Sequence, residues 1–136
     1  MFTISRILNA GANLPETLRL PVTAETSYKA GCALKIASGK ATHCGATDKP
    51  TYLCAEDVAA DAKKTVTAYV LTPDVILEAP VSASVADLSV GTAVTLNVNS
   101  AGMAIGVTAT ATNGVATIYD LCGAAVAGDR VLVRIV

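Results

Sequence analysis

From about residue 28 onward, short apolar runs alternate with clusters of turn-forming residues. Runs of about four to eight β-branched or small apolar residues between such clusters are typical of β-strands. The pattern predicts strands over residues 31–36, 41–44, 51–55, 65–71, 75–78, 92–98, 103–110, 115–121 and 130–136. Their even spacing leaves no room for crossover helices, so we expect an all-β fold, a small antiparallel β-barrel or sandwich.

The connections between these runs carry their own signals. Gly39 is placed to turn the first two strands into a hairpin, and residues 99–102 form a second turn. Asn113 and Gly114 form a dipeptide that typically closes a hairpin, so we expect one between the strands at 103–110 and 115–121. A helix is an alternative to strand and loop mainly in residues 56–64. This most charged segment could form a helical turn or a solvated loop.

Residues 1–27 lack a sustained period of either kind. They contain few charges, scattered apolar side chains and the turn formers Asn9, Gly11, Asn13, Pro15 and Pro21. We therefore expect an extended N-terminal arm, with one short helical turn near residues 4–8 as an option. A single β-rich domain is expected to follow over residues 28–136.

Charge and hydropathy narrow the classes of partner. The ten Lys and Arg residues are spread thinly and the formal net charge is −1, so there is no basic stripe to neutralise nucleic acid. No run approaches the roughly 18 apolar residues of a membrane-spanning helix. The N-terminus also lacks the apolar core of a secretory signal. We expect no nucleic-acid partner, no membrane partner and no cleaved signal.

One long stretch is almost free of charge. Between Asp87 and Asp129 the only charged residue is Asp120, although strands with a solvated face normally carry charges that prevent pairing with other chains. Either Thr, Ser and Asn side chains solvate this stretch, or another subunit covers it. We expect Thr95 and Thr108 to face outward, which makes them candidate subunit-interface residues.

The search for chemistry centres on four cysteines and one histidine. His43 lies beside Cys44, and adjacent strand residues point to opposite faces, which disfavours a Cys-His pair. His43 could meet Cys32 or Cys54 across the hairpin as an active thiol or a metal site, but the spacings contain no C-x-x-C. All four cysteines, Cys32, Cys44, Cys54 and Cys122, are expected to be free thiols.

Neither the carboxylates nor the glycines supply a further candidate. Glu56, Asp57 and Asp61 cluster without the ligand spacing of a calcium loop, so a solvated loop is the simpler interpretation. No phosphate-binding glycine run and no G-x-S-x-G elbow is present. We expect no catalytic residue, no metal and no cofactor, and hence a protein that is not an enzyme.

Five parts of the chain resemble the capsid decoration proteins of tailed phages, also called cement or head auxiliary proteins. The segments are Leu18–Thr23 with Tyr28–Leu34, Gly45–Asp57, Thr72–Glu78, Val90–Val94 and Gly128–Arg134. They share an arm, an Ala-Gly step into a hairpin, a Lys-Pro before a strand and a Gly-Asp before the terminal strand. The resemblance spans most of the chain and rests on this pattern. It implies a β-barrel or β-tulip-like sandwich and no catalysis.

The resemblance also implies a location and partners. A protein of this kind is made in the host cytoplasm and binds the outer surface of the expanded head, often as trimers. There it bridges neighbouring subunits of the major capsid protein. Candidate capsid contacts are the apolar and basic residues of the arm: Phe2, Ile4, Arg6, Ile7, Leu8, Leu14 and Arg19. The alternative for these residues is that they cap the core of their own domain.

Two other functions remain open at this point. One is a tail, connector or fibre-anchor protein of the virion, which would form a closed ring. The other is a β-barrel ligand-binding or enzyme-accessory module, which needs a concave pocket with convergent polar groups. The sequence offers no candidates for the lining of such a pocket.

Overall fold

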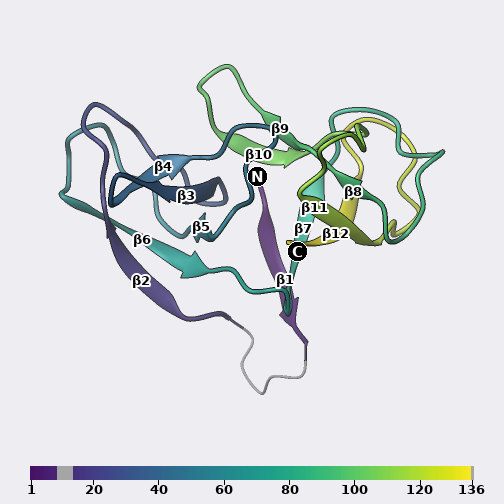
Figure 1. The fold of residues 1–136 in the computed structure, drawn as a ribbon, viewed down its shortest axis with the longest axis horizontal. Coiled ribbons are helices and arrows are strands. Elements are labelled where there is room, and N and C mark those ends of the chain that lie inside the picture. Colours follow the sequence, from purple (N-terminus) through teal and green to yellow (C-terminus); the bar gives the residue numbers. More distant parts are fainter. Residues whose placement is uncertain (9–13, 136) are drawn as a thin grey trace.

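The computed structural model describes residues 1–8 and 14–135, and these residues form twelve strands and no helix (Figure 1). All strand pairs within the two sheets are antiparallel. The all-β prediction is therefore confirmed. Among the described residues, no helix is long and apolar enough to cross a membrane.

The first sheet has five strands in the order β1-β7-β12-β11-β8. Their bounds are β1 Thr3–Ile7, β7 Val75–Pro80, β12 Arg130–Ile135, β11 Ala116–Asp120 and β8 Ala93–Val94. Strands β1 and β8 are its edges. Strand β7 therefore lies between the N-terminal strand β1 and the C-terminal strand β12.

The second sheet has seven strands, six of them in the order β2-β6-β5-β3-β10-β9, with β4 paired to β3. Their bounds are β2 Thr17–Pro21, β6 Thr65–Val70, β5 Tyr52–Cys54, β3 Ala33–Ala37, β10 Ala104–Val107, β9 Leu96–Val98 and β4 Lys40–His43. Its path also ends on two edge strands, β2 and β9. Within the described residues, neither sheet closes into a barrel.

Alternating side chains from both sheets form the larger core. Val131, Val133 and Ile135 of β12 are buried, whereas the residues between them are half-buried on the other face. Leu53 of the second sheet joins the same cluster. Burying a Val or Leu side chain contributes about 1.5 to 3 kcal/mol, so this shared cluster holds the two sheets together.

A second apolar cluster lies around Tyr28 in the seven-stranded sheet. The Tyr28 hydroxyl donates to the Ala41 carbonyl at 2.8 Å and accepts from the Thr23 N–H at 2.8 Å. A buried phenol normally finds such partners, because leaving its hydroxyl unpaired costs free energy. The cluster fixes the segment that leads from β2 into β3.

The described parts of the N-terminal segment, residues 1–8 and 14–27, are not an arm outside the sheets, which corrects the expectation for them. Strand β1 pairs with β7, and β2 pairs with β6 along its full length. The Phe2 side chain is 2% exposed, and its N–H donates to the Gly31 carbonyl at 3.0 Å. A Cβ at Gly31 would lie 2.6 Å from the Phe2 carbonyl oxygen, so glycine is required there for this docking.

Strand β1 also replaces the helical turn suggested for residues 4–8. Both N-terminal strands are sheet edges, bonded to a neighbour on one side, and their alternation is weak: β2 buries only Leu20. The turn formers Asn9, Gly11 and Asn13 lie outside the described residues.

Two predicted turns are confirmed and one is wrong. The Gly39 turn joins β3 to β4, and the turn at 99–102 joins β9 to β10. Asn113 and Gly114 instead carry the chain from β10 of one sheet to β11 of the other. Gly114 packs so closely on the Ala93 backbone that a Cβ would lie 2.3 Å from its carbonyl. The glycine therefore permits a close crossing rather than a hairpin.

Residues 56–64 form turns and bends rather than a helix. Val58 is buried and bridges to Tyr28, with N–H to carbonyl distances of 2.8 and 2.9 Å. The loop alternative for this segment is therefore the correct one.

Candidate functional site

The carboxylates of the charged loop do not converge on one point. Glu56 pairs with Lys63 at 2.8 Å, and this hydrogen bond lowers the pKa of the Glu56 carboxyl. Asp57 accepts the Ala30 N–H at 2.9 Å and Asp61 accepts the Glu25 N–H at 2.9 Å. Asp57 and Asp61 thus hold two different pieces of backbone and Glu56 holds a lysine side chain, so their role is structural.

The cysteines are free, and three of the four are buried. Burial raises the pKa of the Cys44 thiol to about 12. A hydrogen bond with Cys54 and burial raise the pKa of Cys32. The same hydrogen bond lowers the pKa of Cys54. The Cys32 and Cys44 thiols are protonated at neutral pH and are poor nucleophiles, because the thiolate is the reactive form. In the described part of the chain, no group of three His, Cys, Asp or Glu side chains is placed to hold a metal.

In the folded protein, iodoacetamide should alkylate Cys122 and leave the three buried cysteines unmodified. Exposure decides the outcome, because the reagent must reach the sulfur and reacts with its thiolate form. Intact-mass measurement at mildly alkaline pH should show one adduct, and four after denaturation. The variant Cys122→Ser should give none when folded. Rapid alkylation of Cys44 would contradict the burial described above.

His43 serves the fold rather than a thiol. Its Nε2 lies 2.8 Å from the Ser27 carbonyl, and its ring packs against Tyr28 with 5.2 Å between centroids. In the register it lies opposite Leu34. His43 therefore ties the hairpin to the segment before β3.

The predicted capsid contacts fall into three settings. Phe2 is in the core, as the alternative interpretation of these residues expects. Ile4, Ile7 and Leu8 are half-buried. The exposed members of the set are Arg6, Leu14 and Arg19. The structure thus brings Ile4, Ile7 and Leu14 to one side of the molecule and places Arg19 on the far edge strand β2. Capsid contact by these residues stays a prediction.

Two apolar hollows lie along the side where β1 approaches β6, each of about 290 Å³. Ile4 and Tyr69 line the first, and Ile7 and Val70 line the second. Leu14 lines both and is 56% exposed. Leu14 and the two hollows thus form one apolar region on this side of the molecule.

Thr95 does not face outward, which corrects its assignment as an interface candidate, whereas the assignment of Thr108 stays a prediction. Thr95 is 6% exposed, and its hydroxyl lies 2.7 Å from that of Thr108, which is half-buried. The chain leaves the five-stranded sheet after β8 and enters the other sheet at β9, so Thr95 lies at the crossing between them. Backbone bonds from Thr95 to Thr110 and from Thr108 to Thr95, both 2.9 Å, close this crossing.

The charge-poor stretch exposes mainly loops, with Asp120 of β11 as an exposed strand residue. No residue of β8, β9 or β10 is exposed. The exposed positions gather instead in the connections at 89–91, 99–102, 110–113 and 122–128. Asn99 holds one of these loops by accepting N–H groups from Ala101 and Met103 at 3.0 Å. The uncharged surface is therefore a set of hydrogen-bonded turns, with Val90 and Val126 exposed by 62% and 61%.

The fold has a counterpart among solved phage proteins. The crystal structure of the N base of head fiber gp8.5 in bacteriophage phi29 matches this chain with a TM-score of 0.55 and 16% sequence identity. The match covers 89% of this chain and 95% of that chain. No protein-family model and no curated protein sequence matches this chain. At this identity the likeness shows a shared fold, and no residue role is carried over.

Proposed function

We propose that this chain is a structural protein of a tailed-phage virion that binds the outer surface of the assembled head. The observation that carries the proposal is the fold shared with a phage head fiber base over most of both chains. The sequence resemblance to capsid decoration proteins points to the same place. The two arguments are independent, because one rests on backbone geometry and the other on sequence pattern.

In this proposal the chain acts mechanically, as a non-enzymatic cement protein without cofactor. It bridges neighbouring subunits of the major capsid protein, so that separating them also requires breaking the added contacts. A ligand that binds the assembled shell and not dispersed subunits stabilises the shell by mass action. The proposal also includes self-association of the chain as trimers and a β-tulip-like fold.

The side of the molecule that carries the two apolar hollows supports this role. Ile4 and Ile7 belong to β1, which is anchored through the buried Phe2, and Leu14 lines both hollows beside them. Protein interfaces with a well-packed apolar centre need little rearrangement on binding, and rigid placement reduces the entropic cost. We expect capsid contact through this side rather than through a disordered arm.

A fibre anchor is the second candidate, because the matched structure is the base of a head fiber. The match covers 95% of that base, so the likeness extends over nearly all of it. In that case the chain would bind the head in the same way and would also carry a second protein on its outer side.

Purified protein mixed with expanded heads that lack it should co-sediment with them and saturate. Cryo-electron microscopy should then show added density over junctions between capsid subunits, and the decorated heads should withstand higher temperatures than bare heads. Density at single sites with a further protein projecting from them would favour the fibre anchor.

Unexpanded heads provide the control, because their subunit junctions have a different geometry. Absence of binding to expanded heads would contradict the proposed location on the head surface. Binding without any gain in the heat resistance of the heads would contradict the cement role and leave the anchor role.

A further inference from the structure

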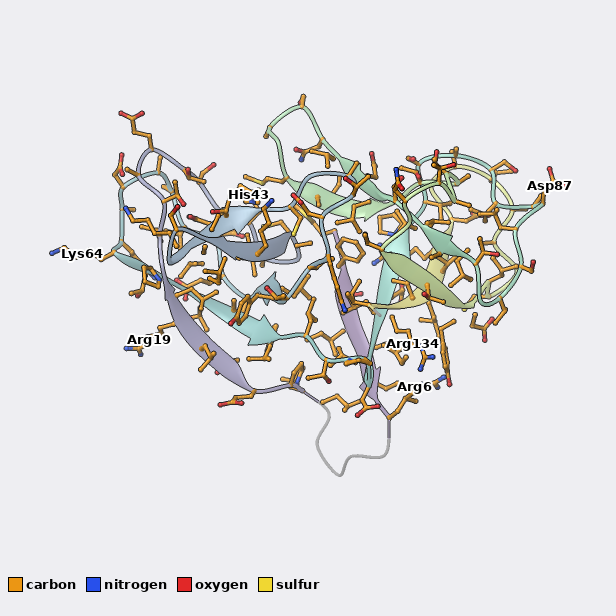
Figure 2. All side chains as sticks on the ribbon, in the orientation of Figure 1. Arg6, Arg19, His43, Lys64, Asp87 and Arg134 are labelled. Atoms are coloured by element: carbon orange, nitrogen blue, oxygen red, sulfur yellow. The ribbon has the colours of Figure 1, made fainter. Side chains whose placement is uncertain are left out.

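The outer face of the five-stranded sheet carries two arginines in one row. Arg6 of β1 and Arg134 of β12 lie directly opposite Ile76 of β7, one on each side. Neighbouring strands are about 4.8 Å apart, so the two arginine Cα atoms are about 10 Å from each other. Figure 2 shows both side chains projecting from the same side of the molecule. Residues from the two ends of the chain thus form one basic pair.

A bulge in β1 produces this placement. The register of β1 against β7 shifts between Ile4 and Arg6, so that Ile4 and Ile7 both face the core while Arg6 faces out. Bulges re-aim side chains in this way at sheet edges. Without the extra residue, Arg6 and Ile4 would share a face.

The two arginines lack an acidic partner. Within residues 1–8 and 14–135, neither Arg6 nor Arg134 forms an ion pair. The acidic groups nearest in the register are already engaged: Glu78 pairs with Arg130, and the Asp120 carboxylate accepts the Cys122 N–H at 2.8 Å. The pair therefore presents two positive charges that the described chain does not neutralise.

The surroundings hold the pair in place. The Arg6 guanidinium lies over the ring of Tyr119, 5.4 Å from its centroid, a cation–π contact that restrains the side chain. Ile76 is 0% exposed and belongs to neither core cluster, so the arginine stems on either side are positioned to cover it. A preorganised guanidinium loses less entropy when it binds a carboxylate.

We propose that Arg6 and Arg134, with Tyr119, form a docking site for carboxylates of an acidic protein partner. Each guanidinium can take one carboxylate through two parallel hydrogen bonds. The partner would therefore present two acidic side chains on a strand or loop, spaced to match two arginines separated by one strand. That the partner is a capsid subunit rests on the proposed function.

The chemistry of this face favours protein over nucleic acid. Two cations flanked by Glu78 and Asp120 neutralise too little phosphate to bind a nucleic-acid backbone, and the net charge of the chain is −1. The face carries Arg and Tyr side chains on β1, β12 and β11, the residue types enriched where protein partners bind most strongly.

The first test measures the affinity for expanded heads lacking the protein. The variants Arg6→Gln and Arg134→Gln should each weaken binding about tenfold and flatten its dependence on salt concentration. Lys64→Gln is the matched control, because Lys64 is exposed directly before β6 (Thr65–Val70) of the other sheet, away from the pair (Figure 2), and is not among the candidate capsid contacts. The double variant Arg6→Lys, Arg134→Lys keeps the charge but loses the paired hydrogen bonds, so its affinity should also fall.

The second test does not depend on heads. A decaglutamate peptide added to the protein should shift the NMR signals of the Arg6 and Arg134 Nε–Hε groups at low salt, and should leave Arg19 unmoved. Tripolyphosphate at matched ionic strength distinguishes a carboxylate site from a general anion site. Circular dichroism on each variant checks that the fold is retained.

The outcomes distinguish failure of the docking site from failure of the proposed function. Heads that bind all variants equally well, with no NMR shift at either arginine, overturn the docking site and leave the proposed function intact. Heads that do not bind even the unmodified protein contradict the proposed function, while shifts at both arginines with decaglutamate still support the site. Equal or larger shifts with tripolyphosphate overturn the assignment of a protein partner.

Discussion

Replacing Phe2 with Ala should lower the free energy of unfolding by about 3 to 5 kcal/mol, the usual cost of removing a buried aromatic ring. Phe2 is 2% exposed and belongs to the core that both sheets share. The loss should appear in urea unfolding as a lower midpoint with an unchanged slope. Deleting residues 1–8 removes β1 as well, and this truncated chain should not reach a stable fold.

Leu14→Ala provides the control, because Leu14 is 56% exposed and its truncation should change stability by no more than about 0.5 kcal/mol. The contrast between two apolar N-terminal residues tests the docking of the segment. If Phe2→Ala unfolds like the parent protein, residues 1–8 would be a detachable arm after all. Leu14→Ala should instead reduce head binding, since this side chain lines both hollows.

Most strands after residue 28 could be predicted from sequence because each carries its own signal. The run at 92–98 is the exception, because it is divided at Thr95 between β8 of one sheet and β9 of the other. In β6 the buried Val66 and Ala68 alternate with more exposed residues, and the turn at Gly39 is local chemistry. Alternation and turn type depend on neighbours in the sequence, so a single sequence shows them. The same reasoning gave the all-β class.

The N-terminal strands could not be predicted because their partners are distant. Strand β1 is held by β7, and Phe2 docks on Gly31. Little in residues 1–8 alone indicates either contact, and an edge strand needs only one bonded neighbour. The hairpin predicted at Asn113 and Gly114 was wrong for a related reason. The same dipeptide forms a crossing between sheets when the flanking strands belong to different sheets.

The same division between local and long-range signals applies to the candidate site. Arg6 stood out as a polar anchor among apolar residues, but Arg134 and Tyr119 did not, because they join it only through the order of β1, β7, β12 and β11 in the sheet. Register across strands decides which charges share a face. The missing signal was long-range pairing rather than residue type.

The variant Thr95→Lys should be destabilised by several kcal/mol, on the order of the 3 to 5 kcal/mol found for an unpaired buried charge. Thr95 is 6% exposed, and its hydroxyl is engaged by that of Thr108 at 2.7 Å. A lysine there must either lose its charge or break the crossing between β8 and β9. Thermal unfolding should show a large drop in Tm, and part of the protein should be insoluble.

Thr110→Lys is the matched control, since Thr110 is exposed and holds Thr95 only through its backbone carbonyl. Its Tm should remain close to that of the parent. This control also tests the charge-free loops, because a lysine at Thr110 places charge on a surface that has almost none. If the loops are covered in the virion, Thr110→Lys should fold normally and bind heads or self-associate poorly, as desolvating an unpaired ammonium is costly. If it folds and assembles like the parent, the loop at 110–113 is ordinary solvated surface, and its low charge has no role in assembly.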